Sequence, residues 1–190
     1  MTTRPIIPSL QAGRSYPRTV KARGNDLELR TLTEAECGDI VEFARGLQEE
    51  DLLFLPLDIT RQDVVAEWVR NIEAGQTFTV LAYDGQTLAG YGSLNRQPTQ
   101  WSRHLGEIRL NVGPGYRGTG LGSLLADEIL DVARHSSLRK IIAQMPRDQE
   151  AARGVFRKLG FDLESMLADW VIDTAGDTHD LVIMAHEVGD

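Results

Sequence analysis

Cysteine is nearly absent from this chain of 190 residues, which contains only Cys37. One cysteine excludes an intramolecular disulfide, and with four scattered histidines it leaves no cluster typical of a metal site. No apolar run approaches the roughly 20 residues of a membrane-spanning helix, and the first residues lack the apolar stretch of a signal peptide. We therefore expect a cytoplasmic protein with no membrane partner and no metal, in which Cys37 is a small buried apolar residue.

An excess of positive charge is also absent. Lys and Arg number 20 against 28 Asp and Glu, which gives a net charge of −8. This balance argues against nucleic acid as the main partner. An acidic body suits a cationic substrate such as an amine, but it equally keeps an ordinary protein soluble. The length indicates one domain with a sizeable core.

Residues 1–26 differ in composition from the rest of the chain. They contain three prolines, little periodicity and a single acidic residue, Asp26, against five basic ones: Arg4, Arg14, Arg18, Lys21 and Arg23. We expect a basic N-terminal extension over 1–26 that is mobile or loosely packed, and a folded domain over 27–190. The extension folding back onto the body, or onto a partner subunit in a homodimer, is the open alternative.

Hydrophobic periodicity predicts the order β-αα-βββ-α-β-α-ββ within residues 27–190. Thr33 with Glu36 forms a capping box at the start of the first helix, and Thr60 with Asp63 repeats the pattern at the second. Asp84 and Gly85 indicate a tight hairpin. The expected strands are 27–32, 77–83, 87–95, 106–112, 139–145 (buried), 161–173 and 178–187. This order predicts a mixed α/β fold, a central mixed sheet flanked by helices.

Five glycines lie within residues 112–122, where an expected strand gives way to an expected helix. Glycines let backbone N–H groups approach an anion, and the helix dipole places positive charge behind them. Arg117 adds a guanidinium suited to phosphate oxygens. The segment predicts a phosphate-bearing ligand. It is not a Walker loop, which needs Lys-Ser or Lys-Thr, and the dinucleotide fingerprint lacks its acidic residue after the next strand.

Another pattern accounts for more of these residues. The segment Arg117–Gly122 reads [RQ]-x-x-G-x-[GA] and resembles the acyl-CoA pyrophosphate loop of the GCN5-related N-acetyltransferase (GNAT) superfamily. The segment Ala152–Phe161 resembles that family's helix ending in LYxKLGF, one strand later, as the family order requires. The resemblance covers about Leu27 to Val188. It implies the GNAT-like acyl-CoA N-acyltransferase fold, with a splayed pair of central strands, and acetyl-CoA as co-substrate.

The resemblance also implies which residues hold acetyl-CoA. Backbone groups of the strand before the loop would hold the pantetheine arm, and the loop with the first helical turn would hold the pyrophosphate. Two further positions belong to the later helix. The implied contacts are Leu110, Asn111, Val112, Arg117, Gly118, Thr119, Gly120, Leu121, Gly122, Ser123, Gln149 and Phe156.

An amine acceptor, with a pKa of about 10.4, must lose a proton before it attacks. A carboxylate near the thioester can take that proton. Glu107 lies on the strand that aims at the thioester, near the place where many family members have a catalytic Glu. The alternative is that Glu107 belongs only to the polar face of a half-exposed strand. Further candidates for proton transfer or for holding a cationic group are His104, Glu50 and Asp51.

The chain departs from the family at Phe156, which stands where an acidic tyrosine hydroxyl is usual. Either the thiolate leaves without a protein acid, or a water serves, or catalysis is poor. This departure favours the alternative of a non-catalytic CoA-binding regulatory module. The apolar run Leu52–Leu57 either lines an acceptor pocket or belongs to the core. We predict an N-acetyltransferase that moves an acetyl group by direct attack to an amine of a small molecule or a protein.

Overall fold

The computed structural model describes residues 9–22, 24–52, 55, 57–96 and 100–189. Within them, eight strands form one sheet in the order β1-β2-β3-β4-β5-β6-β8-β7. Among the strands of this described part, only β5 and β6 pair in parallel. The strands are β1 (Arg18–Ala22), β2 (Asn25–Thr31), β3 (Thr77–Asp84), β4 (Thr87–Arg96), β5 (Leu105–Val112), β6 (Lys140–Pro146), β7 (Asp162–Ile172) and β8 (Thr178–Glu187).

The helices of the described residues are α1 (Cys37–Arg45), α2 (Glu49–Leu52), α3 (Gln62–Glu73), α4 (Leu121–His135) and α5 (Glu150–Lys158). The predicted mixed α/β fold is confirmed, and the predicted order gains two elements, β1 and the short α2. Among the described residues, no helix combines the length and the apolar character that crossing a bilayer requires.

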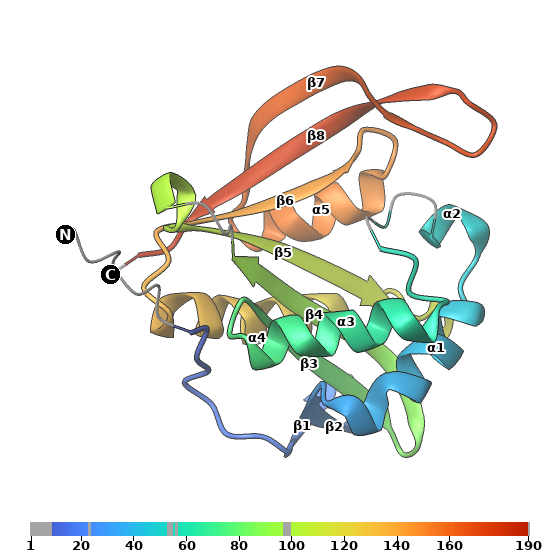
Figure 1. Ribbon diagram of the computed structural model, residues 1–190, viewed down its shortest axis with the longest axis vertical. Coiled ribbons are helices and arrows are strands. Elements are labelled where there is room, and N and C mark those ends of the chain that lie inside the picture. The colour runs from blue at the N-terminus through green and yellow to red at the C-terminus, as the bar shows by residue number, and fades with distance from the viewer. Residues whose placement is uncertain (1–8, 23, 53–54, 56, 97–99, 190) are drawn as a thin grey trace.

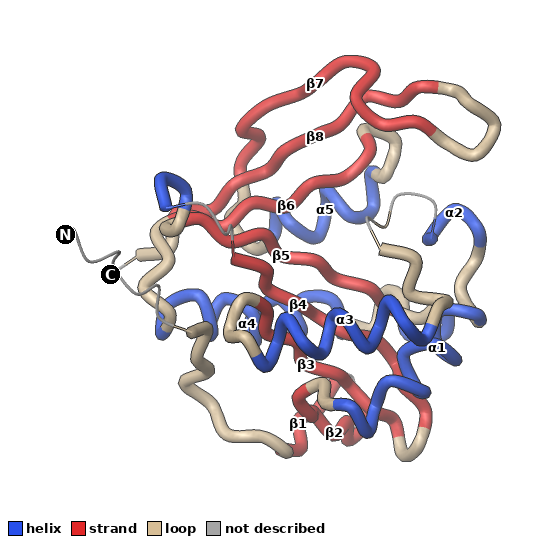
Figure 2. Tube along the Cα trace, in the orientation of Figure 1, coloured by secondary structure: helices blue, strands red, loops and turns tan. Residues whose placement is uncertain are grey.

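Helices cover both faces of the sheet (Figures 1 and 2). Because strand side chains alternate, Val80 and Ala82 join a core with α4 and α5, whereas Leu81 and Tyr83 join a second core with α1 and α3. Cys37 lies in this second core, as predicted, and burial raises the pKa of its thiol. The sheet is therefore the middle of three layers.

The two predicted helix starts had different outcomes. The capping box of Thr33 and Glu36 is confirmed, and it opens a short 3₁₀ turn that leads into α1. The box of Thr60 and Asp63 is wrong, because α3 starts after Arg61 without a side-chain cap. Asp58 Oδ1 accepts from both the N–H and the hydroxyl of Thr60, so the N–H that a capping box would direct to the side chain of Asp63 is already bonded.

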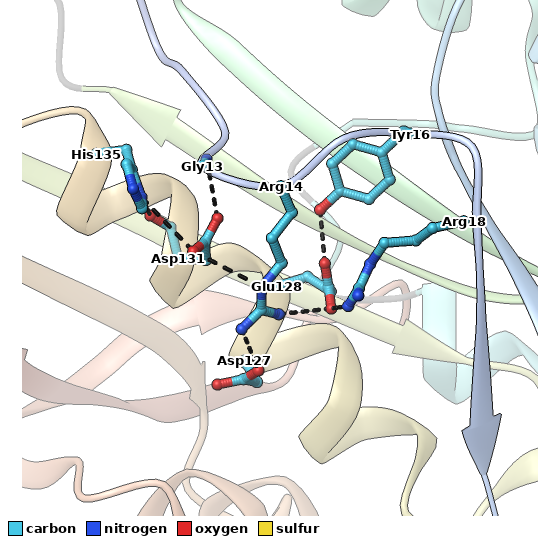
Figure 3. Close-up of polar contacts among 8 residues, drawn as sticks. All are labelled: Gly13, Arg14, Tyr16, Arg18, Asp127, Glu128, Asp131 and His135. Carbon is cyan, nitrogen blue, oxygen red and sulfur yellow. Dashed lines mark hydrogen bonds and ion pairs between the residues drawn. The ribbon is translucent and has the colours of Figure 1, made fainter.

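The expected loose packing of residues 1–26 is wrong for the described residues 9–22. Strand β1 pairs with β2 across five residues, and the preceding segment crosses α4 (Figure 3). Arg14, Tyr16 and Arg18 all donate to the Glu128 carboxylate, which is 1% exposed. Composition missed this because the partner carboxylates lie more than a hundred residues away.

The fold-back alternative is the one observed. Arg14 also pairs with Asp127 at 2.8 Å, and the Gly13 N–H donates to Asp131 at 3.0 Å. Burial, with the hydrogen bond to Glu128, raises the pKa of the Tyr16 phenol. We call residues 9–22 the N-terminal strap, and their division from the domain at residue 27 stays a prediction.

The β7–β8 hairpin forms the opposite edge of the sheet. It extends beyond the helical layers at the top of Figure 1. Register shifts between Leu163 and Ser165, and between Leu167 and Val171, bend its outer strand. Asp169, in the second shift, has a positive φ of 51°.

Candidate functional site

The parallel strands β5 and β6 form a fork. They pair through three residues only, Leu105–Glu107 with Lys140–Ile142. Beyond Glu107, β5 continues to Val112 paired with β4 on its other side. The strands therefore diverge inside the sheet, as the family resemblance implied, and leave unpaired backbone edges along the gap.

Gln144 lies on β6 beyond the last residue that pairs with β5. Its side chain is exposed although β6 is an interior strand. The expectation that residues 139–145 are a buried strand is wrong at Gln144, because its side chain lies on the face of β6 opposite Ala143 and Met145, which belong to the α4–α5 core. Sequence reasoning did not select Gln144, but a polar residue inside an apolar run was the available signal.

The side chains of residues 110–112, at the end of β5, pack against neighbouring strands and helices. Asn111 is buried and hydrogen-bonds the Tyr91 hydroxyl. The pKa of Tyr91 is raised, because the effect of burial exceeds the lowering effect of this hydrogen bond. Leu110 and Val112 pack against the α4 core. The Val112 carbonyl accepts from Arg117 Nε at 3.3 Å. The backbone of residues 108–112 has no partner strand on the β6 side.

The glycine loop joins the end of β5 to α4. Gly118 and Gly120 have φ of +71° and +90°, a conformation that side chains rarely adopt. A Cβ at either position would meet nothing within 4 Å, so the loop faces open space. Gly120 is the N-cap of α4 and offers no side-chain cap.

The first turn of α4 lacks acidic residues. The first hydrogen bond of the helix runs from the Leu124 N–H to the Gly120 carbonyl. The N–H groups of Leu121, Gly122 and Ser123 come before it and have no carbonyl partner within the helix. The Thr119 hydroxyl donates to Tyr116 O at 2.6 Å and fixes the turn before it. The loop therefore presents uncompensated N–H dipoles, the arrangement that binds anions.

Arg117 lies beside this loop and is held by Asp51 of α2. Its Nη2 contacts Asp51 Oδ2 at 2.6 Å, and both side chains retain solvent access. The structure thus brings together two residues that the sequence assigned to different partners, a phosphate and a cationic acceptor. An anion at the loop would compete with Asp51 for the Arg117 guanidinium.

Glu107 is the last residue of the β5–β6 pairing, so its carboxylate marks the branch point of the fork. Its side chain is 13% exposed, and Oε1 accepts from Arg109 Nε at 2.9 Å. In the register with β4, Glu107 pairs with Asn95. It shares a face with Ile142 and Gln144 of β6 by strand alternation. A half-buried carboxylate at this point can accept a proton from a group in the gap.

The two predicted contacts on α5 differ in burial. Gln149 is the N-cap residue, half-buried, and its side chain does not cap the helix. Phe156 is buried and packs edge-on against Phe161 with ring centroids 5.0 Å apart. Phe156 is therefore a core residue, and its position supplies no hydroxyl.

The remaining candidates lie elsewhere or outside the described side chains. His104 lies before β5, at the end of the strand away from the glycine loop, in a basic cavity of about 470 Å³. The Glu50 side chain lies outside the described part, as do residues 53, 54 and 56 of the apolar run. Leu52 and Leu55 pack against the α1–α3 core, and Leu57 is exposed.

Comparisons with known proteins agree with this geometry. The model of the acetyltransferase (GNAT) family matches residues 40–161. Glucosamine 6-phosphate N-acetyltransferase of Trypanosoma brucei brucei is 31% identical over 140 residues, 72% of this chain and 89% of that protein. N-alpha-acetyltransferase RimI of Mycobacterium tuberculosis is 30% identical over 100 residues, 50% of this chain and 59% of that protein.

Solved structures show the same fold. The structure of yncA from Salmonella typhimurium, with its cofactor acetyl-CoA, superposes with a TM-score of 0.75 at 19% identity, over 86% of this chain and 95% of that one. The family model covers more than half of the chain, and it includes the fork, the glycine loop and α5. The chain therefore belongs to the acetyltransferase (GNAT) family and is an acetyltransferase.

Proposed function

We propose that the protein is an N-acetyltransferase that moves an acetyl group from acetyl-CoA to an amine by direct attack. The observation that carries this proposal is the fork at Glu107. At this point the strands stop pairing, and the half-buried Glu107 carboxylate lies there. From here β5 leads directly to the glycine loop. Unpaired backbone suits the amide-bearing pantetheine arm, and the carboxylate suits an ammonium group.

The residues present fit acetyl-CoA. Positive φ at Gly118 and Gly120, with open space around both, makes room for a pyrophosphate against the backbone. Residues 121–123 add the N–H groups of the first helical turn, and Arg117 adds a guanidinium. Bound acetyl-CoA supplies an acetyl thioester, and the backbone of 110–112 would orient its arm along the gap.

Glu107 is the proposed base. An acceptor ammonium entering the gap would lose its proton to the carboxylate, directly or through a water, and the freed amine attacks. The exchange forms one C–N bond, breaks one C–S bond and yields an amide and a thiol. Arg109 orients the carboxylate through Oε1.

The departing sulfur needs no protein acid in this proposal. A thiol has a pKa of about 8.5, so its thiolate is a competent leaving group near neutral pH. Phe156 packs in the core against Phe161 and takes no part in proton transfer in this proposal. The acceptor's identity, the cytoplasmic location and a homodimer all stay predictions, since the relatives' names point to both a sugar phosphate and a protein N-terminus.

Glu107→Gln tests the base. We expect kcat to fall by about 10²–10⁴-fold with the KM for acetyl-CoA unchanged, because a base acts on the chemical step. Thiol release over a panel of amines measures this, with the exposed helical Glu73→Gln as the charge-matched control. An unchanged pH–rate profile in Glu107→Gln would remove Glu107 from the role. Acetyl-CoA binding without thiol release for any amine would favour the regulatory module.

Arg117 and Asp51 test the loop. Arg117→Ala should weaken CoA binding by about 1.5–3 kcal/mol, the range for a charged hydrogen bond. Asp51→Asn should instead tighten it, because the guanidinium no longer has to leave a carboxylate. Calorimetry measures both, with Asp63→Asn, which breaks the exposed pair with Arg61, as the matched control. Folded wild-type protein that gives no heat with CoA or acetyl-CoA would overturn the proposed function.

A further inference from the structure

A cavity of about 470 Å³ lies at the amino end of β5, the end away from the glycine loop. Its wall combines the end of β4, the short turn η2 (Gln100–Ser102), the residues before β5 and the connection from α4 to β6. These segments meet at the left of Figure 1. The volume lies within the roughly 300–1,000 Å³ of small-molecule sites.

The charge of this wall is opposite to that of the whole protein. Arg96, Arg103 and Arg139 supply three guanidinium groups, and no described residue that lines the cavity is Asp or Glu. The chain as a whole has 28 acidic residues against 20 basic ones. Because a guanidinium fork donates in pairs to anionic oxygens, three forks around one cavity favour an anion of more than one charge, such as a phosphate monoester.

Hydrogen bonds between its segments hold the frame of the cavity. Arg96 is 9% exposed, and its Nη2 donates to the Ser136 carbonyl at 2.9 Å, which ties β4 to the end of α4. The His104 carbonyl accepts from the Arg139 N–H at 2.9 Å, which ties the residues before β5 to the start of β6. The cavity is therefore preformed, and a ligand would not have to order its walls.

Several polar groups of the wall are available to a ligand. His104 and Arg139 are exposed, and neither side chain has a hydrogen-bond or ion-pair partner within the described residues. Ser137 follows the C-cap of α4 with a φ of 55°. Glycine is usual at this position, and serine there adds a hydroxyl to the lining of the cavity.

Trp101 gives the lining an aromatic surface, and it is 86% exposed. An exposed indole offers a stacking face to a planar ring. A phosphate monoester that carries such a ring matches both the guanidinium groups and the indole. A nucleic acid chain matches less well, because its remaining phosphates would meet an acidic protein.

We propose that this cavity binds a small phosphate monoester with a planar ring, of the nucleoside monophosphate class. Arg103 and Arg139 would hold the phosphate, and the ring would stack on Trp101. The site is separate from the glycine loop, because the strand from His104 to Val112 spans roughly 26 Å. Binding here therefore goes beyond acetyl transfer and does not depend on it.

Calorimetry of the full chain with AMP, ribose 5-phosphate and adenosine tests the proposal, each with and without saturating CoA. AMP should bind most tightly, ribose 5-phosphate less tightly and adenosine least, and CoA should leave the Kd for AMP unchanged. AMP should also raise the melting temperature of wild type.

Two exposed side chains separate the phosphate from the ring. Arg139→Ala should raise the Kd for AMP by about 10–100-fold, the loss of one charged hydrogen bond. Trp101→Ala should raise the Kd for AMP about tenfold and leave that for ribose 5-phosphate unchanged, because only the ring stacks. Arg45→Ala, at an exposed arginine of α1, is the charge-matched control and should change neither. The ligand-free variants should melt with wild type.

Four results would overturn the proposal. They are no binding of AMP by folded wild type, an equal Kd for AMP in Arg139→Ala and Arg45→Ala, displacement of AMP by CoA, and equal affinity for AMP and ribose 5-phosphate. A polyadenylate oligonucleotide that binds more tightly than AMP, with the same dependence on Arg139, would make the cavity part of a nucleic-acid surface, and the proposal would fail.

Discussion

The N-terminal strap and the β7–β8 hairpin lie at opposite edges of one sheet and carry opposite charge, yet they use it differently. The strap's Arg14 and Arg18 converge on Glu128, which they bury. The hairpin leaves Asp162, Asp169 and Asp177 in solvent beside exposed Trp170. Charge that is paired and buried within the chain contributes to the stability of the fold, whereas exposed carboxylates such as those of the hairpin contribute little to it.

The largest expected effect tests the strap. Glu128→Gln should lower the free energy of unfolding by about 3–5 kcal/mol, because a buried carboxylate with three donors loses its charge. Its neighbour Asp127 is 55% exposed, so Asp127→Asn should cost only about 0–1 kcal/mol. Urea unfolding measures both. Equal losses in the free energy of unfolding would mean that burial of Glu128 does not increase its contribution to stability.

A chain starting at Asn25 measures the contribution of the whole N-terminal strap to stability. It loses β1 and the partly buried Leu10, Tyr16 and Val20, whose packing is offset by the cost of ordering the segment. We expect a net loss of about 1–3 kcal/mol, or roughly 2–12 °C in melting temperature. In this background Glu128 is solvated, so Glu128→Gln should change stability by less than about 0.5 kcal/mol. A cost as large as in the full chain would contradict the role of the strap.

The smallest effect concerns the hairpin tip. The hydrogen bond between Asp173 and His179, 3.0 Å long, raises the pKa of His179 and lowers that of Asp173. The histidine's contribution is complete below its unfolded pKa of about 6.5 and is lost as pH rises through the higher folded value. The aspartate's contribution is complete above its unfolded pKa of about 3.9 and is lost as pH falls through its lowered folded value.

The tip should therefore be most protected between about pH 4 and 6.5. The Ala175 and Asp177 N–H groups both donate to Asp173, so their hydrogen-exchange protection factors report this. We expect a decrease from pH 5.5 to pH 8 in wild type and none in His179→Gln. Constant protection in wild type would show that the pair has no effect on the tip.

Patterns that depend on near neighbours predicted the structure well. The Thr33–Glu36 capping box, the turn at Gly85 and the strand-loop-helix arrangement around Gly120 are all observed. Each rests on residues within one turn or one loop. The Thr60 prediction failed for a local reason as well, because Asp58 accepts the Thr60 N–H that the capping box requires.

Features that depend on distant partners could not be predicted. The strap looked disordered because its own apolar content is low, and its partners lie on α4, more than a hundred residues away. The pairing of Arg117 with Asp51 joins positions 66 residues apart. Exposure of Gln144 depends on which face of β6 the helices cover, and the apolar run around it does not indicate that.

The sequence by itself determined the α/β architecture, the family and the local conformation of the glycine loop. Alternation, capping and positive φ are local requirements that particular residues meet wherever the chain goes. Tertiary structure alone decided that Glu107 stands at the fork, that Glu128 receives the strap and that Arg117 meets Asp51. Those outcomes depend on which distant groups meet across the folded sheet, and sequence separation carries no information about that distance.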